Sequence, residues 1–220
     1  MTIPEEKYAP GKNRKVLIPG PCGNVEACIS IPDNRIRNTI VVISHPHPLY
    51  GGTMQNKVVH TLDRTFYELG MITARFNFRG VGESDGQYDE GEGETDDLRA
   101  VVNWMRSQFP GLELCLAGFS FGAFISLKAT AALLPSMLVT VAPPVSIFNF
   151  TSIQGPNCEW LLIQGEQDEV VDAGKVLEWA RQFSNIDVVG LPGAGHFFHG
   201  KLNDLKTIVM NRIGSVESGK

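Results

Sequence analysis

The sequence predicts a single α/β domain built on a mostly parallel, twisted sheet with helices on both faces. Two observations lead to this prediction. Short apolar runs alternate with longer amphipathic runs along the chain, and polar residues rarely interrupt the apolar runs. Strand–helix alternation favours a parallel sheet, and near-continuous apolar strands are typical of a sheet covered on both faces. The 220 residues, 43% of them hydrophobic, suffice for one such core.

Six runs predict strands because each is short, rich in Val, Ile and Leu, and bounded by Gly, Pro or Asn. They cover residues 38–44, 71–78, 112–118, 137–142, 159–165 and 186–191. Five runs with helical spacing predict helices over residues 56–70, 95–111, 121–134, 173–183 and 198–213. Thr95 is the expected N-cap of the second helix.

The front of the chain predicts an antiparallel hairpin at one edge of the sheet. Its two strands are RKVLIPG (14–20) and NVEACISIP (24–32). We expect residues 1–220 to form one domain, with residues 1–12 and 214–220 as flexible ends.

Charge and composition narrow the function classes. The net charge is −5 and no run of Lys or Arg occurs, so we expect neither nucleic acid nor membrane as a partner. The start of the chain lacks the apolar segment of a secretory signal. Cys22, Cys28, Cys115 and Cys158 show no metal-type spacing, so we expect a cytoplasmic protein with reduced thiols. Residues 83–97 hold eight acidic side chains and no basic one, which predicts a solvated loop and an acidic first helical turn.

The pattern G-x-S-x-G occurs twice, around Ser84 and around Ser120. In nucleophilic serines this pattern forms a sharp turn between a strand and a helix. The helix N-terminus then supplies a positive dipole and a free N–H for a developing oxyanion. Ser120 fits, because LELCLA precedes it and an apolar, Ala-rich helical run follows it, whereas Ser84 leads into DGQYDEGEGE. Ser120 is therefore the expected nucleophile, and the alternative is a serine that merely fits a tight turn.

A nucleophilic serine needs a general base, and the base needs an acid that orients it. His196 lies in a Gly-rich loop just past a predicted strand, while His199 lies nearer the last helix. Asp168 follows the preceding strand. Three further carboxylates in that loop are alternatives: Glu166, Glu169 and Asp172. Ser120, Asp168 and His196 stand in a known triad order, and we expect them to meet where the parallel strands end.

These motifs resemble the α/β-hydrolase fold family over nearly the whole chain. GFSFG is similar to the family's nucleophile elbow, GEQDEVV to its acid turn and GAGH to its histidine loop. FNFRGVGESDG resembles a structural loop of the family, which again argues against Ser84. The resemblance implies a serine hydrolase in which His196 takes the proton of Ser120 and Asp168 orients His196.

The stretch SHPHPLYGGTMQNKVV (44–59) resembles the oxyanion loop of a bacterial subgroup of small, capless serine hydrolases. Its two first prolines have no N–H to donate. The amide of Leu49 or of Tyr50, together with the amide of Phe121, is therefore expected to hold the oxyanion.

The same stretch contains an H-x-H pair, His45 and His47, which is a fragment of metal-ligand patterns. No third His, Cys, Asp or Glu follows at the spacing of a metal site. The simpler interpretation is that one of these histidines forms a hydrogen bond with nearby backbone. We therefore expect neither a metal nor another cofactor.

Residues 143–158 join two predicted strands and are too few for a lid domain, so we expect an open site. Nearby apolar side chains predict a pocket for the acyl group of a small-molecule substrate. Those expected to bind it are Phe119, Val145, Phe148 and Phe197. A further hypothesis is a homodimer, in which a second copy of the chain covers the open side of the site.

Taken together, the sequence predicts a carboxylesterase that cleaves small acyl esters through an acyl-enzyme. Thioester hydrolysis, amide hydrolysis or acyl transfer would use the same residues. A binding protein that keeps the fold without turnover is the alternative from another class.

Overall fold

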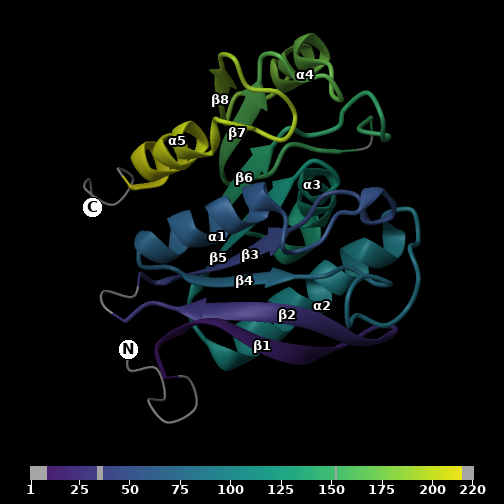
Figure 1. Ribbon diagram of the computed structural model, residues 1–220, viewed down its shortest axis with the longest axis vertical. Coiled ribbons are helices and arrows are strands. Elements are labelled where there is room, and N and C mark those ends of the chain that lie inside the picture. The colour runs from purple at the N-terminus through teal and green to yellow at the C-terminus, as the bar shows by residue number, and fades with distance from the viewer. Residues whose placement is uncertain (1–8, 34–36, 152, 215–220) are drawn as a thin grey trace.

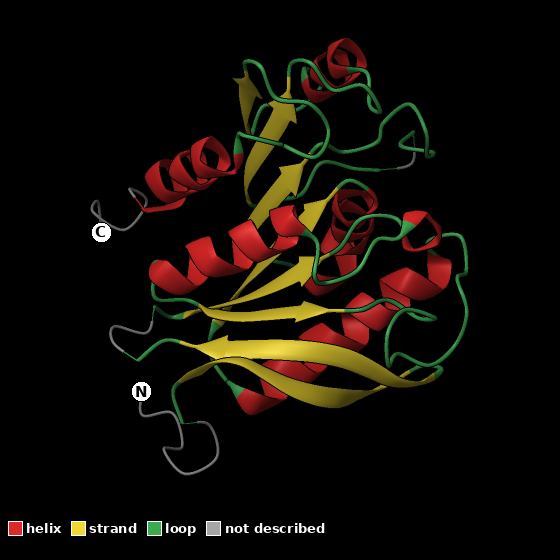
Figure 2. Cartoon of the chain, viewed as in Figure 1, coloured by secondary structure: helices red, strands yellow, loops and turns green. Residues whose placement is uncertain are grey.

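A computed structural model describes residues 9–33, 37–151 and 153–214, and these form one eight-stranded sheet (Figures 1 and 2). The strand order is β1-β2-β4-β3-β5-β6-β7-β8. The strands are β1 (Gly11–Gly20), β2 (Gly23–Ile31), β3 (Thr39–Ser44), β4 (Ile72–Phe76), β5 (Glu113–Phe119), β6 (Met137–Val141), β7 (Glu159–Gly165) and β8 (Ile186–Leu191). From β4 to β8 all neighbours run parallel, while β1 and β2 form an antiparallel hairpin at the edge next to β4. The predicted fold class is confirmed.

Helices cover both faces of the sheet. Side chains of α1 (Lys57–Glu68) and α5 (Leu202–Gly214) pack on one face. Those of α2 (Glu92–Gln108), α3 (Phe121–Leu133) and α4 (Ala173–Ala180) pack on the other. The consecutive residues Val41 and Val42 belong to opposite faces and both are fully buried. This double coverage explains why the strands read as unbroken apolar runs.

No lid covers the sheet. Residues 142–158 join β6 to β7, and the described part of this connection, all but residue 152, contains no helix. Among the described residues, no helix is long and apolar enough to pass through a bilayer. All four cysteines are free.

The ends of the chain differ in part from our expectation. Residues 1–8 and 215–220, which we expected to be flexible, lie outside the described residues. Residues 11 and 12 already belong to β1, and residue 214 is the last of α5.

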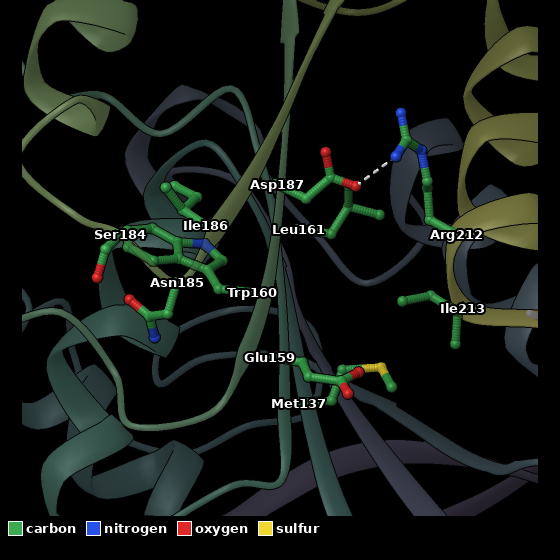
Figure 3. A pocket seen from close by; sticks show the side chains of 10 residues that line it. All are labelled: Met137, Glu159, Trp160, Leu161, Ser184, Asn185, Ile186, Asp187, Arg212 and Ile213. Carbon is green, nitrogen blue, oxygen red and sulfur yellow. Dashed lines mark ion pairs between the residues drawn. The ribbon is translucent and has the colours of Figure 1, made fainter. Parts of the chain in front are cut away.

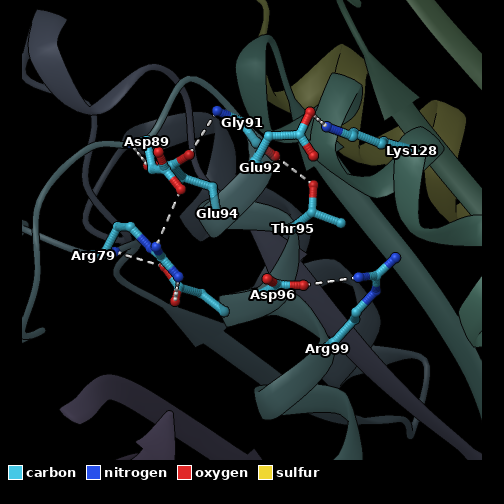
Figure 4. A network of polar contacts seen from close by, with 10 residues as sticks. Arg79, Asp89, Gly91, Glu92, Glu94, Thr95, Asp96, Arg99 and Lys128 are labelled. Carbon is cyan, nitrogen blue, oxygen red and sulfur yellow. Dashed lines mark hydrogen bonds and ion pairs between the residues drawn. The ribbon is translucent and has the colours of Figure 1, made fainter. Parts of the chain in front are cut away.

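The start of α2 corrects our prediction that Thr95 is the N-cap. The helix begins at Glu92 with Gly91 as N-cap, and the Glu94 carboxylate accepts the Gly91 N–H at 2.7 Å (Figure 4). The Thr95 hydroxyl lies inside the first turn and donates to the Gly91 carbonyl at 2.6 Å. The glycine cap was missed because a glycine has no side chain that signals a helix start.

The acidic segment 83–97 is an exposed loop followed by the acidic first turn of α2, which confirms the prediction for this segment. Asp97 is buried and accepts two hydrogen bonds from the Arg79 guanidinium, at 2.9 and 3.0 Å. At the surface, Glu92 pairs with Lys128 and Asp96 with Arg99 (Figure 4). Asp97 therefore ties α2 to the loop that carries Arg79, and Glu92 ties α2 to α3.

Candidate active site

The side chains expected to act together lie at the carboxyl ends of the parallel strands. Ser120 follows β5 directly, Asp168 lies in the loop after β7, and His196 lies in the loop after β8. The loop with residues 45–52 follows β3 at the same edge. Ligands of open parallel sheets bind at this edge.

Ser120 sits on a strained turn between β5 and α3. Its backbone has φ 54° and ψ −118°, a conformation that costs a non-glycine residue on the order of 1–3 kcal/mol. Its N–H is held by the Val141 carbonyl of β6 at 2.8 Å. The flanking glycines are required by space: a Cβ on Gly122 would lie 2.2 Å from the Ser44 carbonyl oxygen, and one on Gly118 would lie 2.2 Å from the Gly122 carbonyl oxygen.

The structure brings Ser120, His196 and Asp168 into one hydrogen-bonded chain. His196 Nε2 lies 3.1 Å from Ser120 Oγ, and His196 Nδ1 lies 2.9 Å from Asp168 Oδ2. An ionised carboxylate only accepts hydrogen bonds, so Nδ1 carries the ring proton and Nε2 is left to accept from the serine hydroxyl. The His196 and Asp168 side chains are 3% and 0% exposed, so water does not compete with this contact.

Asp168 is stabilised as a carboxylate. Burial disfavours its charge, but hydrogen bonds from His196 and from the Val171 and Val170 amides outweigh burial and hold the pKa below its ordinary value. The two amides donate to Oδ1 at 2.7 and 2.9 Å.

The rival histidine and carboxylates have other roles. His199 is exposed, and its ring lies near Phe197. Asp172 caps α4 by accepting the Lys175 N–H, and Glu169 accepts the backbone N–H of His196 at 3.0 Å. The second serine, Ser84, is buried and its hydroxyl donates to the Asn77 carbonyl at 2.7 Å.

The loop after β3 uses both backbone amides that we expected to be oxyanion donors. The Leu49 amide donates to His47 Nδ1 at 3.2 Å and the Tyr50 amide to the His47 carbonyl at 3.2 Å, so both are consumed within a 3₁₀ turn over Pro48–Tyr50. The amides of His47 and Phe121 donate to no other described residue, and both residues line the cavity beside Ser120.

The two loop histidines form hydrogen bonds with backbone in and near their own loop. His45 Nδ1 lies 2.6 Å from the Pro46 carbonyl, and Nε2 accepts the Phe78 N–H at 3.0 Å. Burial lowers the pKa of His45 to about 4, so the ring is neutral and both its nitrogens are occupied. Within the described residues, no cluster of three His, Cys, Asp or Glu side chains is arranged to bind a metal ion.

A cavity of about 460 Å³ opens in front of Ser120. Its lining comes from the β3 loop, the elbow, the β6–β7 connection and the two loops that carry Asp168 and His196. The lining residues are Pro46, His47, Tyr50, Gly51, Gly52, Asn56, Ser120, Phe121, Pro144, Ile147, Phe148, Val170, His196 and Phe197. The set is mostly apolar and includes no Asp, Glu, Lys or Arg.

Two of the four expected pocket residues, Phe148 and Phe197, line this cavity, whereas Phe119 and Val145 do not. Phe119 is fully buried, because β5 continues through it and turns its side chain into the core on the α1 and α5 face. Its ring centroid lies 5.1 Å from that of His196, which it supports from behind. Val145 is half-buried and packs against the core of the other face.

A second cavity of about 350 Å³ lies at the opposite end of the sheet (Figure 3). It opens at the first residues of β6, β7 and β8, and Asp187 pairs there with Arg212 at 2.9 Å. No histidine lines it. The serine–histidine contact belongs to the first cavity.

A lidless α/β sheet with a serine on a strained turn, in contact with a histidine, defines the class of α/β serine hydrolases. The sequence profile of X-Pro dipeptidyl-peptidase (S15 family) matches residues 24–155, which include Ser120. The chain therefore belongs to the S15 family.

Two solved structures agree with this class, and a curated relative matches most of the chain. The chain is 42% identical to a protein of Xanthomonas campestris described as an α/β serine hydrolase without lid, with 93% of this chain and 94% of that chain covered and a TM-score of 0.89. It is 44% identical to an α/β serine hydrolase homologue of Coxiella burnetii, with 94% and 100% covered and a TM-score of 0.90. An uncharacterized protein of Rickettsia prowazekii is 32% identical over 191 residues, which are 81% of this chain and 80% of that protein.

Proposed function

We propose that this hydrolase is a carboxylesterase that cleaves small, uncharged acyl esters with Ser120 as nucleophile. The observation that carries the proposal is the contact of 3.1 Å between Ser120 Oγ and His196 Nε2, with Asp168 behind the ring, at the wall of an apolar cavity.

The proposed reaction has two halves. Ser120 Oγ attacks the ester carbonyl while His196 Nε2 takes the hydroxyl proton; the C–O bond to the alcohol then breaks, and His196 returns the proton to the leaving alkoxide. A water molecule next attacks the acyl-enzyme, His196 takes a proton from the water, and the proton goes back to Ser120 Oγ as the carboxylic acid leaves. Asp168 stabilises the imidazolium in both halves.

We assign the oxyanion hole to the backbone amides of His47 and Phe121. The Phe121 amide is the first N–H of α3 and stands at the positive end of the helix dipole. The His47 amide approaches from the loop after β3. Each such donor typically contributes about 2.7–4 kcal/mol of transition-state stabilisation.

The cavity lining supports the substrate class. Phe148, Ile147 and Phe197 offer apolar surface for an acyl chain, and no charged side chain is present to pair with a charged substrate. A dipeptidyl-peptidase would have to bind the free amino terminus of its substrate, and an ammonium group buried without a carboxylate partner is costly. The absence of Asp and Glu from the lining therefore favours uncharged esters.

The direct test is hydrolysis of p-nitrophenyl esters from acetate to octanoate by the wild type and by Ser120→Ala. We expect hydrolysis that depends on Ser120 and falls with acyl length, and covalent labelling of the wild type alone by a fluorophosphonate, read by intact mass. Equal rates in both proteins would refute the role of Ser120. Labelling without ester hydrolysis, combined with cleavage of an acyl thioester or an X-Pro p-nitroanilide, would move the substrate to that class. A wild type that neither reacts nor hydrolyses would indicate a binding protein.

A further inference from the structure

We propose that Gln164 is a positioning residue that holds the Asp168 carboxylate for catalysis. The proposal rests on the proposed function, because it assigns Gln164 a role in the reaction of Ser120 and His196. Gln164 is the penultimate residue of β7 and is 1% exposed.

The Gln164 amide has only one orientation that suits its surroundings. Its Nε2 lies 3.0 Å from Asp168 Oδ2 and 3.1 Å from the Gly165 carbonyl oxygen. Both partners only accept hydrogen bonds, so the NH₂ end must face them. Gln164 therefore donates to the same carboxylate oxygen that receives the Nδ1 proton of His196.

With Gln164 in place, the Asp168 carboxylate accepts four hydrogen bonds. Oδ2 accepts from Gln164 and His196, and Oδ1 accepts from the amides of Val170 and Val171. Four donors on two oxygens fix the plane of the carboxylate. Rotation of the carboxylate away from His196 would break several of these bonds at once.

Stability does not account for an amide at this position. The Oε1 atom of Gln164 is buried and has no hydrogen-bond partner among the described residues. A buried unpaired oxygen usually destabilises a fold, and the neighbouring β7 residue on the same face, Leu162, is apolar and fully buried. An apolar side chain of similar length would avoid the unpaired oxygen, so the N–H end explains the residue.

Removal of the Nε2 donor should have a defined chemical effect. Among the donors named above, His196 would then be the one left on Asp168 Oδ2, and its hydrogen bond to that oxygen would become stronger. The protonated form of His196 would be stabilised as a result. Because the reaction needs neutral His196, the acid limb of the kcat profile would move to higher pH. The loosened carboxylate would also orient the ring less well and lower kcat, while substrate binding in the cavity would stay unchanged.

The test compares Gln164→Met with Gln167→Met. Methionine matches glutamine in length and lacks the N–H. Gln167 lies in the loop after β7, is exposed, and its side chain makes no hydrogen bond to the other described residues, so it is a matched control. Rates are divided by the concentration of active sites titrated with a fluorophosphonate. For Gln164→Met we expect kcat about 10-fold lower, unchanged KM, an acid limb roughly half a pH unit higher, and a Tm equal to or above that of the wild type.

A second variant, Gln164→Glu, and a second measurement, proton NMR, test the same role of Gln164 independently. Gln164→Glu places a carboxylate against Asp168 Oδ2 and should lower kcat further, because like charges repel. The low-field proton NMR resonance of the His196 Nδ1–H should shift in Gln164→Met and stay in place in Gln167→Met.

The inference would be overturned if Gln164→Met kept the wild-type kcat, pH profile and resonance. It would also be overturned if that variant lost only thermal stability. Loss of the proposed function would look different: the wild type and Ser120→Ala would then hydrolyse esters equally, while the NMR comparison would still decide the role of Gln164.

Discussion

The His47 backbone amide offers the sharpest test of the proposed oxyanion hole, because proline can remove it. His47 has φ −53° and ψ 123°. Proline prefers φ near −65°, and an extended ψ also suits the residue before Pro48. The His47 N–H donates to no described residue, so His47→Pro deletes a donor without breaking a hydrogen bond of the resting protein.

His47→Pro also removes the imidazole side chain, so its activity must be compared with that of His47→Ala. Both variants lose the ring that packs near Tyr50, Tyr88 and Phe121, and both lose the Nδ1 acceptor of the Leu49 amide. They differ in one N–H. A donor worth about 2.7–4 kcal/mol corresponds to about 10²–10³ in kcat, and this is the ratio we expect between His47→Ala and His47→Pro.

The assay is hydrolysis of p-nitrophenyl acetate under saturating conditions, with thermal unfolding of both variants to establish that they are folded. We expect KM to change little, because the donor acts on the oxyanion and not on the bound ester. If both variants turned over at the same rate, the His47 amide would not belong to the oxyanion hole.

Three further predictions follow from the same geometry. Asp168→Asn should lower kcat by about 10⁴-fold, because an amide N–H facing Nδ1 favours the wrong tautomer of His196; a loss below 10-fold would contradict this role. Gly122→Ala should lower the free energy of unfolding by about 3 kcal/mol, since its Cβ would press on a carbonyl oxygen at 2.2 Å, whereas Gly11→Ala, where nothing lies within 4 Å, should be neutral in urea titrations. His45, whose pKa falls from 6.5 to about 4 on folding, takes up its proton more readily in the unfolded chain. The stability that neutral His45 contributes is therefore fully present above pH 6.5 and is lost as the pH falls toward 4. Between pH 7 and pH 5 the free energy of unfolding of the wild type should fall by about 2 kcal/mol more than that of His45→Gln. Parallel curves of unfolding free energy against pH for the two proteins would refute this.

The turn at Ser120 was predictable because its signals are local. A strand, two glycines, a serine and an apolar helix are adjacent in the sequence around Ser120. Asp168 and His196 could be chosen because each lies in the loop after a strand, and parallel strands bring their carboxyl ends to one edge. Hydrophobic alternation could also have placed Phe119 in the core, since Cys115, Ala117 and Phe119 share one face of β5.

The oxyanion loop could not be resolved in the same way. The choice between Leu49, Tyr50 and His47 depends on which amides a 3₁₀ turn consumes, and that depends on the His47 side chain folding back onto the Leu49 N–H. The role of Gln164 was equally hidden. In the sequence it is one polar residue near the end of an apolar strand, and only its distance to Asp168 gives it a function.

Several features that cost stability lie where the chemistry is proposed. Ser120 has a positive φ, and the Asp168 carboxylate is buried at the same edge of the sheet. Of the three buried side-chain atoms without a partner in the described residues, two belong to Ser44 and Gln164, at the carboxyl ends of β3 and β7. Folding alone would not favour these features, because an apolar side chain or an unstrained backbone at the same position would give a more stable fold. Together they support a site at this edge of the sheet, and the buried apolar cores on both faces of the sheet supply stability that offsets their cost.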